Sequence, residues 1–487
     1  MDIISLGVAS KQKKRIEKII ANPDSTSGIV TVPSTIELGE TITIPTGRIA
    51  VLPNVTVDGT LVVDGEVFVP SGATLGDLED QIATVDARVD ATNIVVASNT
   101  ASILDIKTQG IKLYTGAYGL NWDQTNDIYL RTGSSNYTSI QSLMKRCVLN
   151  TDGSVRYYLH AENSNYKADG TIAVLDGTDG NVMVQVPKFY YKYAYVTQGG
   201  GVVHSHSISL TPEVGYTVHD AFVRGGVEVD YRYYPAYLGY SSGGKLLSRS
   251  GVYPTVSQTR AQFRTLARAN GAGWEQIDFL LYEAITLLMV IEYGTMNIQS
   301  ALGQGRTALT GGTWVGGSLI GINGLSNSLG NGTGNVTYAG GADDAAADGS
   351  FMSYRGCENF FGNVWRFVDG INCQGNMVKL IYLNQNPATY AEDVFTGDYV
   401  SIGVTTANAV GYARTLGNTR KGFIPVSVSG GSSSVGTTDY YYTSSTVNTL
   451  ALVGGTADNG LNAGPLALLV YDAVSLSAVL VSAGLCR

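Results

Sequence analysis

The stretch YRGCENFFGNVWRFVDG, residues 354–370, holds a tryptophan, three phenylalanines, two carboxylates and a thiol. A segment of this kind either carries out chemistry or holds a fold together. Trp365 and Phe367 alternate with Val364 and Val368, so both sets of side chains are apolar. A short run that is apolar on both faces predicts a strand buried on both sides. We therefore interpret the stretch as part of a hydrophobic core.

Upstream of this stretch, one segment predicts a long helix. Residues 274–294, WEQIDFLLYEAITLLMVIEYG, place apolar side chains such as Ile277 and Leu281 along one face at helical spacing. Acidic residues favour its start, and Gly294 favours its end. Farther upstream, NVMVQVPKFYYKYAYV, residues 181–196, alternates as strands do. The globular part of the chain is therefore expected to be mainly β with some α.

A heptad repeat precedes this globular part. Ten mostly apolar positions follow one another at alternating spacings of three and four residues. That spacing predicts a coiled coil, because a helix on the surface of a globule would show a period of about 3.6 residues. β-Branched residues at both seams favour three helices over two, and a polar asparagine in the seam would fix the register. The seam positions are Leu75, Leu78, Ile82, Val85, Val89, Thr92, Val96, Asn99, Ile103 and Ile106.

The residues before the repeat show other patterns of apolar and polar side chains. Residues 10–21, SKQKKRIEKIIA, predict a short helix with isoleucines on one side and cations on the other. Residues 43–72 alternate apolar and polar side chains between frequent turn residues, and VDG occurs twice. Strands this short are marginal alone, so we expect them to pair within the chain or between copies of it. The cations of the first segment are Lys11, Lys13, Lys14, Arg15 and Lys18.

The composition argues against several classes of function. The chain has 487 residues and a net charge of −9, so no general affinity for nucleic acid is expected. The N-terminus lacks the order of a signal peptide, and no apolar run is long enough for membrane insertion. Thirty tyrosines suit strands as well as adhesive surfaces. The four cysteines show no metal-like spacing and are expected to be free and buried.

The segment GCENFFGNVWRFVDG, residues 356–370, resembles the GNVWEWV signature of the formylglycine-generating-enzyme-like branch of the C-type lectin fold. The helical segment at 274–294, KGFIPVSVSGGSSSVGTTDYYY at 421–442 and the last residues from 454 onward are similar to that fold as phages use it. There it forms the tip of trimeric receptor-binding proteins, including tropism determinants diversified by retroelements. VMVQVPKFYYKY and YTVHDAFVRGG also resemble phage tail proteins. The likeness covers roughly residues 108–487; before that, only the architecture is similar to phage fibres.

The resemblance implies structural roles for the motif residues. Their asparagine and aspartate side chains would hold loops through backbone amides, because a fold with much irregular backbone has many N–H groups to satisfy. The residues expected in the core are Trp274, Asn359, Phe361, Gly362, Asn363, Trp365 and Asp369.

The chain departs from the enzymes of that branch. Those enzymes share a pair of cysteines near the C-terminus. This chain has no such pair, so oxidase chemistry is not expected. His204 and His206, in HSH, are better explained by a strand than by a metal site. The triplets of calcium-dependent lectins, phosphate loops and nucleophile elbows do not occur. We expect no catalytic residue, metal or cofactor, although glycosidase carboxylates have no fixed spacing in a sequence.

These observations divide the chain into five segments. They are an attachment segment at 1–27, a short trimeric β segment at 28–72, a coiled-coil stalk at 73–107, a β-rich intermediate domain at 108–250 and a C-type-lectin-fold tip at 251–487.

The resulting interpretation is a homotrimeric phage tail fibre of the virion that binds a bacterial surface receptor, glycan or protein, by multivalent non-covalent contact. Its basic N-terminal residues would dock on an acidic tail or baseplate protein. One alternative is a stalked lectin-fold enzyme such as a surface polysaccharide depolymerase, and another is a surface adhesin. In the related tips, loops among the last hundred or so residues make the contact. The candidates by position are Tyr440, Tyr441, Tyr442, Asp458, Asn459, Tyr471 and Asp472.

Overall fold

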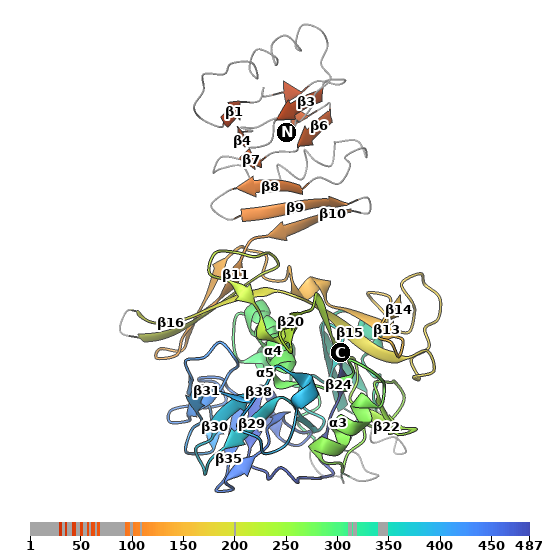
Figure 1. Ribbon diagram of the computed structural model, residues 1–487, viewed down its shortest axis with the longest axis vertical. Helices are drawn as coiled ribbons and strands as arrows, with labels where there is room; N and C mark the ends of the chain where they lie inside the picture. Colours follow the sequence, from red (N-terminus) through yellow and green to blue (C-terminus); the bar gives the residue numbers. More distant parts are fainter. Residues whose placement is uncertain are drawn as a thin grey trace. The chain divides into compact units, whose positions relative to one another are not determined.

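The protein folds into two compact units, which Figure 1 shows in a computed structural model. Unit 1 comprises residues 1–118 and 133–139, and unit 2 comprises residues 119–132 and 140–487. Strands predominate over helices among the described residues, which confirms the prediction of a mainly β protein. The structure describes residues 29–31, 35–36, 41–44, 49–51, 56–57, 60–63, 66–68, 93–97, 101–107 and 110–487, the last range without 199–200, 310–313, 315–318 and 339–348.

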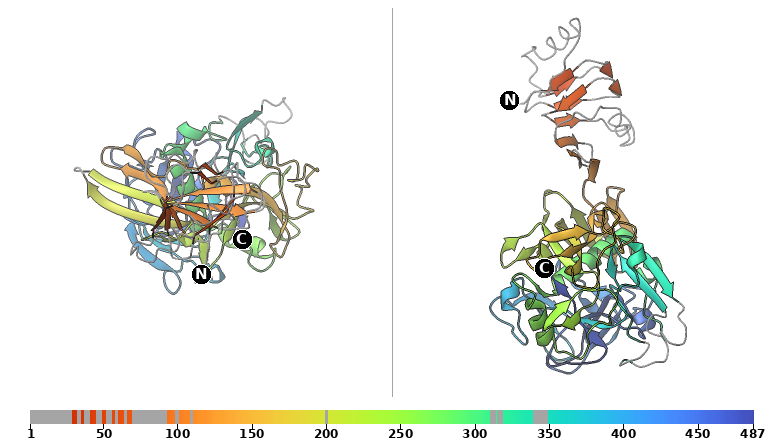
Figure 2. Two further views of the ribbon diagram at one scale, coloured as in Figure 1. Left: turned by 90° about the horizontal axis from the view of Figure 1, so that it is seen from above. Right: turned by 90° about the vertical axis from the view of Figure 1, so that its right-hand side faces the viewer.

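Unit 1 contains a stack of short parallel strands (Figure 2). β1 pairs with β4 and β4 with β7, while β2 pairs with β5 and β3 with β6, all in parallel. Strands three apart along the chain are thus neighbours, which is the pairing of a solenoid in which each turn lies on the previous one. The partners of these short strands come from the same chain. Their bounds are β1 Ile29–Thr31, β2 Thr35–Ile36, β3 Thr41–Ile44, β4 Ile49–Val51, β5 Thr56–Val57, β6 Thr60–Val63 and β7 Glu66–Phe68.

The end of the predicted coiled coil is not helical. β8 (Asn93–Ala97) and β9 (Ala101–Lys107) pair in antiparallel, and β9 pairs in turn with β10 (Gly110–Thr115). The helix prediction is therefore wrong for Val96, Ile103 and Ile106, which lie in strands. β-Branched side chains suit a strand as well as a coiled-coil seam, so the heptad spacing did not decide between them. The other seven seam positions and the basic residues between 11 and 18 lie outside the described residues.

Unit 2 is assembled from several small sheets. Hydrogen-bonded neighbours run β12-β11-β17-β16-β18, β14-β13-β15-β21, β32-β35-β38-β37-β28-β39, β31-β30-β29-β36 and β25-β26-β27, with four further strand pairs. The bounds in the first two sheets are β11 Tyr118–Asp123, β12 Ile128–Gly133, β13 Lys145–Leu149, β14 Val155–Tyr158, β15 Asn181–Pro187, β16 Tyr190–Gln198, β17 Gly201–Ser209, β18 Thr217–Val218 and β21 Tyr231–Pro235.

The remaining strands of unit 2 are short, and many join segments far apart in the sequence. Their bounds are β19 Val223–Arg224, β20 Val227–Glu228, β22 Tyr240–Ser242, β23 Lys245–Leu247, β24 Glu275–Gln276, β25 Gly334–Tyr338, β26 Gly349–Tyr354, β27 Cys357–Glu358, β28 Trp365–Phe367, β29 Ile371–Gln374, β30 Leu380–Leu383, β31 Val400–Thr405, β32 Gly411–Tyr412, β33 Thr415–Leu416, β34 Pro425–Ser427, β35 Tyr440–Thr443, β36 Asn448–Thr449, β37 Leu452–Gly454, β38 Gly464–Val470, β39 Val481–Ser482 and β40 Leu485–Cys486.

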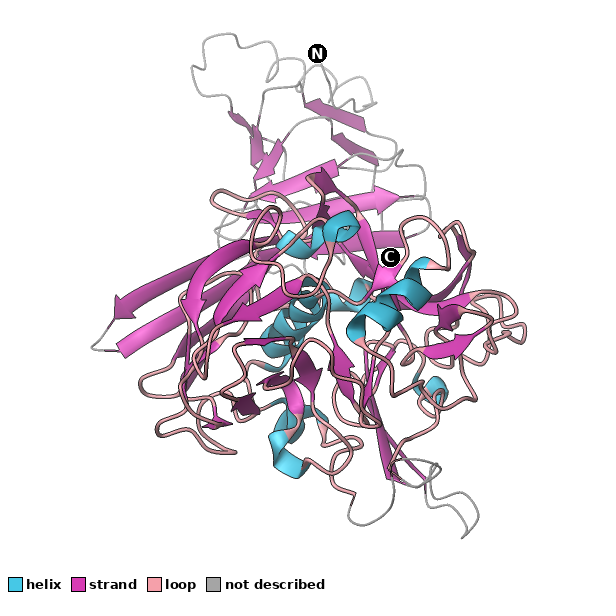
Figure 3. Ribbon diagram, turned by 60° about the horizontal axis from the view of Figure 1, so that its bottom comes forward, coloured by secondary structure: helices cyan, strands magenta, loops and turns pink. Residues whose placement is uncertain are grey.

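The long helix α4 (Phe279–Tyr293) lies inside unit 2, among strands (Figure 3). Its side chains are buried from Phe279 to Ile291. The Asp278 carboxylate caps it by accepting a 2.8 Å hydrogen bond from the Leu281 N–H, and Gly294 ends it with a φ of 69°. The predicted helix began earlier, but Glu275–Gln276 instead pair with β40.

Two shorter helices were not predicted. α3 (Arg260–Arg268) begins with a capping box, in which Thr259 and Gln262 exchange side-chain and backbone hydrogen bonds. α5 (Ile298–Leu302) follows α4 after a short turn. No helix among the described residues has the length and apolar character that crossing a membrane requires.

The stretch 354–370 lies in the core of unit 2. β28 (Trp365–Phe367) is buried between β37 and β39, as the apolar alternation predicts. All seven residues expected in the core are buried, and the four cysteines are free and buried as expected. The cluster around Trp365 includes Met183 as well as Phe263. Residues on both sides of the predicted domain boundary at residue 250 therefore share one core. The residues just before that boundary form the hairpin of β22 and β23.

A buried ion-pair network fixes the end of this stretch. Asp369 accepts hydrogen bonds from Nε and Nη2 of Arg264, and the Nη2 contact measures 2.8 Å. Arg264 also reaches Glu392, which Arg260 contacts at 3.1 Å. The Asp369 side chain is fully buried, so its charge depends on these arginines.

We predict that Asp369→Asn lowers the free energy of unfolding by about 3 kcal/mol, the low end for breaking a buried pair, because Glu392 still neutralises Arg264. Urea denaturation of unit 2 measures the loss. The matched control is Asp230→Asn, since Asp230 is 79% exposed and pairs with Lys188 at 2.9 Å. That exposed pair should contribute less than about 1 kcal/mol. Equal effects of the two substitutions would contradict the role given to Asp369.

Candidate functional site

The tyrosines predicted for receptor contact divide between the two faces of β35. Tyr440 and Tyr442 are half-buried and point to the same side of the strand, because side chains alternate. Tyr441 points the other way and is fully buried, and its hydroxyl donates a 2.7 Å hydrogen bond to Thr406 Oγ1. The prediction of a receptor contact at Tyr441 is therefore wrong, since a buried ring cannot touch another molecule.

Three tyrosines and one asparagine form a compact group that we call the tyrosine face: Tyr412, Tyr440, Tyr442 and Asn462. β32 pairs with β35 so that Tyr412 lies opposite Tyr440, and their ring centroids are 5.1 Å apart. The rings of Tyr440 and Tyr442 are 4.7 Å apart. The Tyr412 hydroxyl donates a 2.7 Å hydrogen bond to Asn462 Oδ1, and Asn462 Nδ2 lies 3.5 Å from the Tyr442 hydroxyl.

Two of the other predicted contact residues border this face. Asp458 is exposed and accepts a 2.7 Å hydrogen bond from the Thr456 hydroxyl. Asn459 accepts a 3.1 Å hydrogen bond from the Thr456 N–H, which holds the turn immediately before Asn462. These two residues therefore belong to the loop that supplies the asparagine of the tyrosine face.

Tyr471 and Asp472 follow β38, which runs parallel to β35. Tyr471 is 52% exposed, and its carbonyl accepts a 2.6 Å hydrogen bond from the Ser444 hydroxyl just beyond β35. Asp472 is half-buried, and burial raises the pKa of its carboxyl. Both lie at the end of the strand pair that carries Tyr440 and Tyr442.

The tyrosine face is rigid and amphipathic. Trp365 of the core packs edge-on against Tyr442, with ring centroids 5.8 Å apart. Burial raises the pKa of Tyr412 and of Tyr442, so both phenols stay neutral and can donate as well as accept. Half-buried tyrosines offer apolar area and a hydroxyl at a small entropic cost, because their rotamers are already fixed. The arrangement suits recognition of a surface better than catalysis.

The two histidines of HSH lie inside the first sheet of unit 2. Their rings are buried on β17 and stack 6.3 Å apart. His204 contacts the Tyr193 hydroxyl and Gln124 Oε1, each at 2.9 Å, and His206 contacts the Tyr191 hydroxyl at 2.7 Å. Burial lowers the pKa of His204 to about 4 and of His206 to about 3. Within the described ranges, no group of three or more histidine, cysteine or acidic side chains is placed to hold a metal.

One buried carboxyl in unit 2 has the properties of a catalytic acid but not the access. Burial raises the pKa of Glu283 on α4 to about 8, and its Oε2 accepts a 2.8 Å hydrogen bond from the Phe423 N–H. With His206, His219 and Arg420 it lines a space of about 10 Å³. Such a space holds one water and no sugar ring. The cluster therefore does not favour the alternative of a polysaccharide-cleaving enzyme.

Tyr412 was missing from the residues predicted for contact. It lies between the segments 354–370 and 421–442 that were quoted for the resemblance, and it joins the tyrosine face through the pairing of β32 with β35. The alternation within DYYY, in contrast, could have separated Tyr441 from its two neighbours.

We predict that Tyr441→Ala lowers the free energy of unfolding by about 3–5 kcal/mol, as loss of a large buried ring does. Tyr440→Ala is the matched control and should cost less than about 1.5 kcal/mol, since Tyr440 is only partly buried. Denaturant titration of both variants measures the difference. Similar losses would contradict the division of β35 into a buried and an outward face.

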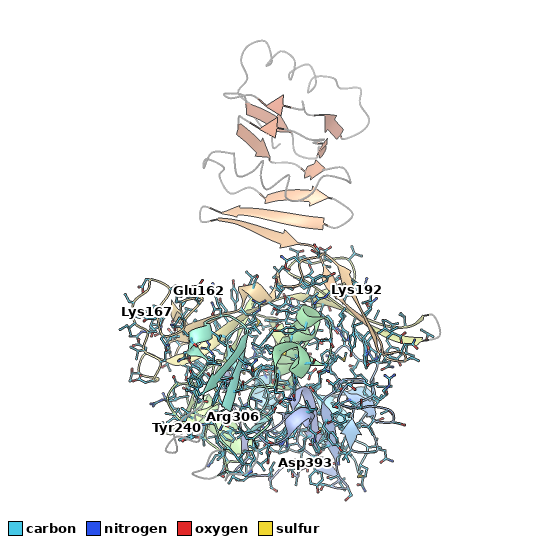
Figure 4. All side chains as sticks on the ribbon, turned by 180° about the vertical axis from the view of Figure 1, so that it is seen from behind. Glu162, Lys167, Lys192, Tyr240, Arg306 and Asp393 are labelled. Carbon is cyan, nitrogen blue, oxygen red and sulfur yellow. The ribbon has the colours of Figure 1, made fainter. Side chains whose placement is uncertain are left out.

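A second prediction concerns pH. The carboxyl of Glu283 has an ordinary pKa of 4.5 and a pKa of about 8 in the folded protein. At a pH between these two values it is protonated in the folded protein and ionised in the unfolded chain. The folded state then binds the extra proton, so stability falls as pH rises through this window. Glu283→Gln removes this loss of stability. The melting temperature of the variant minus that of the wild type should therefore increase from pH 5 to pH 8. The control for the loss of one carboxylate is Glu162→Gln, at an exposed position labelled in Figure 4.

The chain was also compared with known proteins. No family model matches it, and no curated protein matches it either. A functional proposal therefore depends on the geometry of the tyrosine face and on the sequence resemblances described above.

Proposed function

We propose that the chain is a phage tail fibre that binds a bacterial surface receptor through the tyrosine face, by non-covalent contact. The observation that carries this proposal is the group of Tyr412, Tyr440 and Tyr442, which are packed ring to ring and remain partly exposed. Aromatic residues held in this way dominate the binding energy of many protein interfaces. The receptor is a glycan or a protein of the cell envelope.

The residues around the tyrosine face fit a contact surface. Leu461 is 48% exposed beside Asn462, and Val410 is 48% exposed two residues before Tyr412. Asp458 adds an exposed carboxylate, and Tyr471 an exposed ring. Apolar anchors beside adaptable polar groups are typical of recognition surfaces.

The proposal includes the finer architecture inferred from the sequence. Residues 251–487 would have the C-type lectin fold, to which the buried strand β28 and the capped helix α4 lend support. The homotrimer was inferred from ten heptad positions between Leu75 and Ile106, of which Val96, Ile103 and Ile106 lie in strands. The other seven positions keep the spacing that favours three helices, and three tips multiply a weak contact by avidity. The basic residues Lys11, Lys13, Lys14, Arg15 and Lys18 would attach the fibre to the tail or baseplate of the virion.

Binding to cells tests the tyrosine face. On a bacterial strain that the labelled full-length chain binds, the double variant Tyr412→Ala/Tyr440→Ala should bind at least about tenfold more weakly, because each truncated anchor removes roughly 1 kcal/mol or more. Tyr231→Ala/Tyr253→Ala removes two tyrosines that are 50% and 48% exposed elsewhere in unit 2 and should bind as the wild type does. The reverse pattern would move the receptor contact away from the tyrosine face.

Native mass spectrometry tests the assembly. The full chain should have three times its monomer mass of 51.5 kDa. Three copies are expected because β-branched seam residues favour trimers. A monomeric chain would contradict both the fibre architecture and multivalent binding.

A further inference from the structure

Unit 2 contains an open hollow of about 740 Å³ that shares no residue with the tyrosine face. One wall is the turn between β19 and β20, at Gly225 and Gly226. Another is the segment 383–402 around β30 and β31, and the third is the loop 419–421 between β33 and β34. Hollows of roughly 300–1,000 Å³ hold small ligands in other proteins. Its volume is therefore sufficient for one or two sugar rings.

Two cations of this hollow share a single carboxylate. Arg420 Nη1 lies 3.3 Å from Asp220 Oδ2, and Lys421 Nζ lies 3.6 Å from Asp220 Oδ1. Both contacts are long for charge-assisted hydrogen bonds, and both cationic side chains are about one-third exposed, at 30% and 33%. The two cations face the carboxylates of Asp220 and Asp398, so the net charge of these four side chains is zero. An anion that enters the hollow is therefore bound locally, by the N–H donors of Arg420 and Lys421.

The segment 383–402 supplies groups suited to hydroxyls. Gln385 Nε2 donates a 3.2 Å hydrogen bond to the Asp220 carbonyl, which directs its amide and leaves Oε1 as an acceptor. Asp398 Oδ2 accepts hydrogen bonds from Asn386 at 2.9 Å and from Thr389 at 2.7 Å, which fix the carboxylate. Ser401 adds a hydroxyl, and Val400, which is 63% exposed, adds an aliphatic surface. Oriented amide and carboxylate groups beside an aliphatic patch match the hydroxyls and C–H face of a sugar.

We propose that this hollow binds a saccharide unit that carries a carboxylate. Arg420 and Lys421 bind the carboxylate, Gln385 and Asp398 accept hydrogen bonds from its hydroxyls, and Ser401 lines the same space. The site goes beyond the proposed receptor contact, because it has other residues and another chemistry. An experiment can therefore contradict the saccharide site without contradicting the receptor contact at the tyrosine face, and the reverse.

Equilibrium binding to the full-length chain tests the proposal, with sodium glucuronate, glucose and sodium acetate as the probes. Saturation-transfer NMR and calorimetry should detect glucuronate with a dissociation constant of order ~1 mM, and glucose and acetate at least about tenfold more weakly, since each lacks one of the two recognised groups. The double variant Arg420→Gln/Lys421→Gln should lose at least about tenfold in glucuronate affinity.

Two further variants keep the result interpretable. Ser401→Trp places an indole ring in the hollow while Arg420 and Lys421 keep their charges, and it should also abolish glucuronate binding. Lys167→Gln should bind as the wild type does, because Lys167 does not line the hollow. Figure 4 shows Lys167 well apart from Asp393. Melting temperatures near the wild-type value show that each variant is folded.

Three results would overturn the proposal. They are equal affinity for glucose and glucuronate, equal affinity for acetate and glucuronate, and wild-type binding by both Arg420→Gln/Lys421→Gln and Ser401→Trp. Glucuronate binding that persists in Tyr412→Ala/Tyr440→Ala supports a separate site. Loss of glucuronate binding in that variant would overturn the separation.

Discussion

The packing of unit 2 depends on the buried carboxylate of Asp369. Its side chain pairs with Arg264 of α3, which also reaches Glu392, and its backbone bonds to Ile277 and Phe279 on either side of the cap of α4. One residue thus holds together a helix, the start of another helix and the end of a strand. The cap residue Asp278 is itself paired with the buried Arg232 at 2.6 Å. Buried pairs of this kind add little net stability over apolar contacts, but the loss of one partner leaves an uncompensated charge.

A second buried cation, Arg366, lies within the same stretch. Arg366 stands where the signature it resembles has a glutamate, and it is buried. Its Nη2 donates to the carbonyls of Asn359 and Gly362, which belong to a turn whose residues have positive φ, 44° at Asn359 and 64° at Asn363. The guanidinium therefore stabilises a strained turn through backbone oxygens. This role is structural, which agrees with the interpretation of the stretch as core.

The sequence predicted those parts of the fold that local patterns determine. The buried strand around Trp365 and the helix α4 both appear in the structure. The sequence placed apolar side chains on one face of that helix, whereas the structure buries every side chain from Phe279 to Ile291. The tyrosine face was predicted only in part, since Tyr412 meets Tyr440 through a strand pairing between distant segments. The strands at Ile103 and Ile106 contradicted the heptads, because isoleucine suits both structures. The hollow with Arg420 and Lys421 had no sequence pattern, as three separate segments build it.

The stack of parallel strands in unit 1 has a consequence for how such a chain can change. Each turn of the stack pairs with the turns next to it, as β4 does with β1 and β7. Stability in an arrangement of this kind is a sum over neighbouring turns. Duplication or loss of one turn in the gene would therefore change the length of the stack in fixed increments while every remaining pairing is kept. The length of unit 1 can therefore evolve stepwise, without a change in the residues of unit 2.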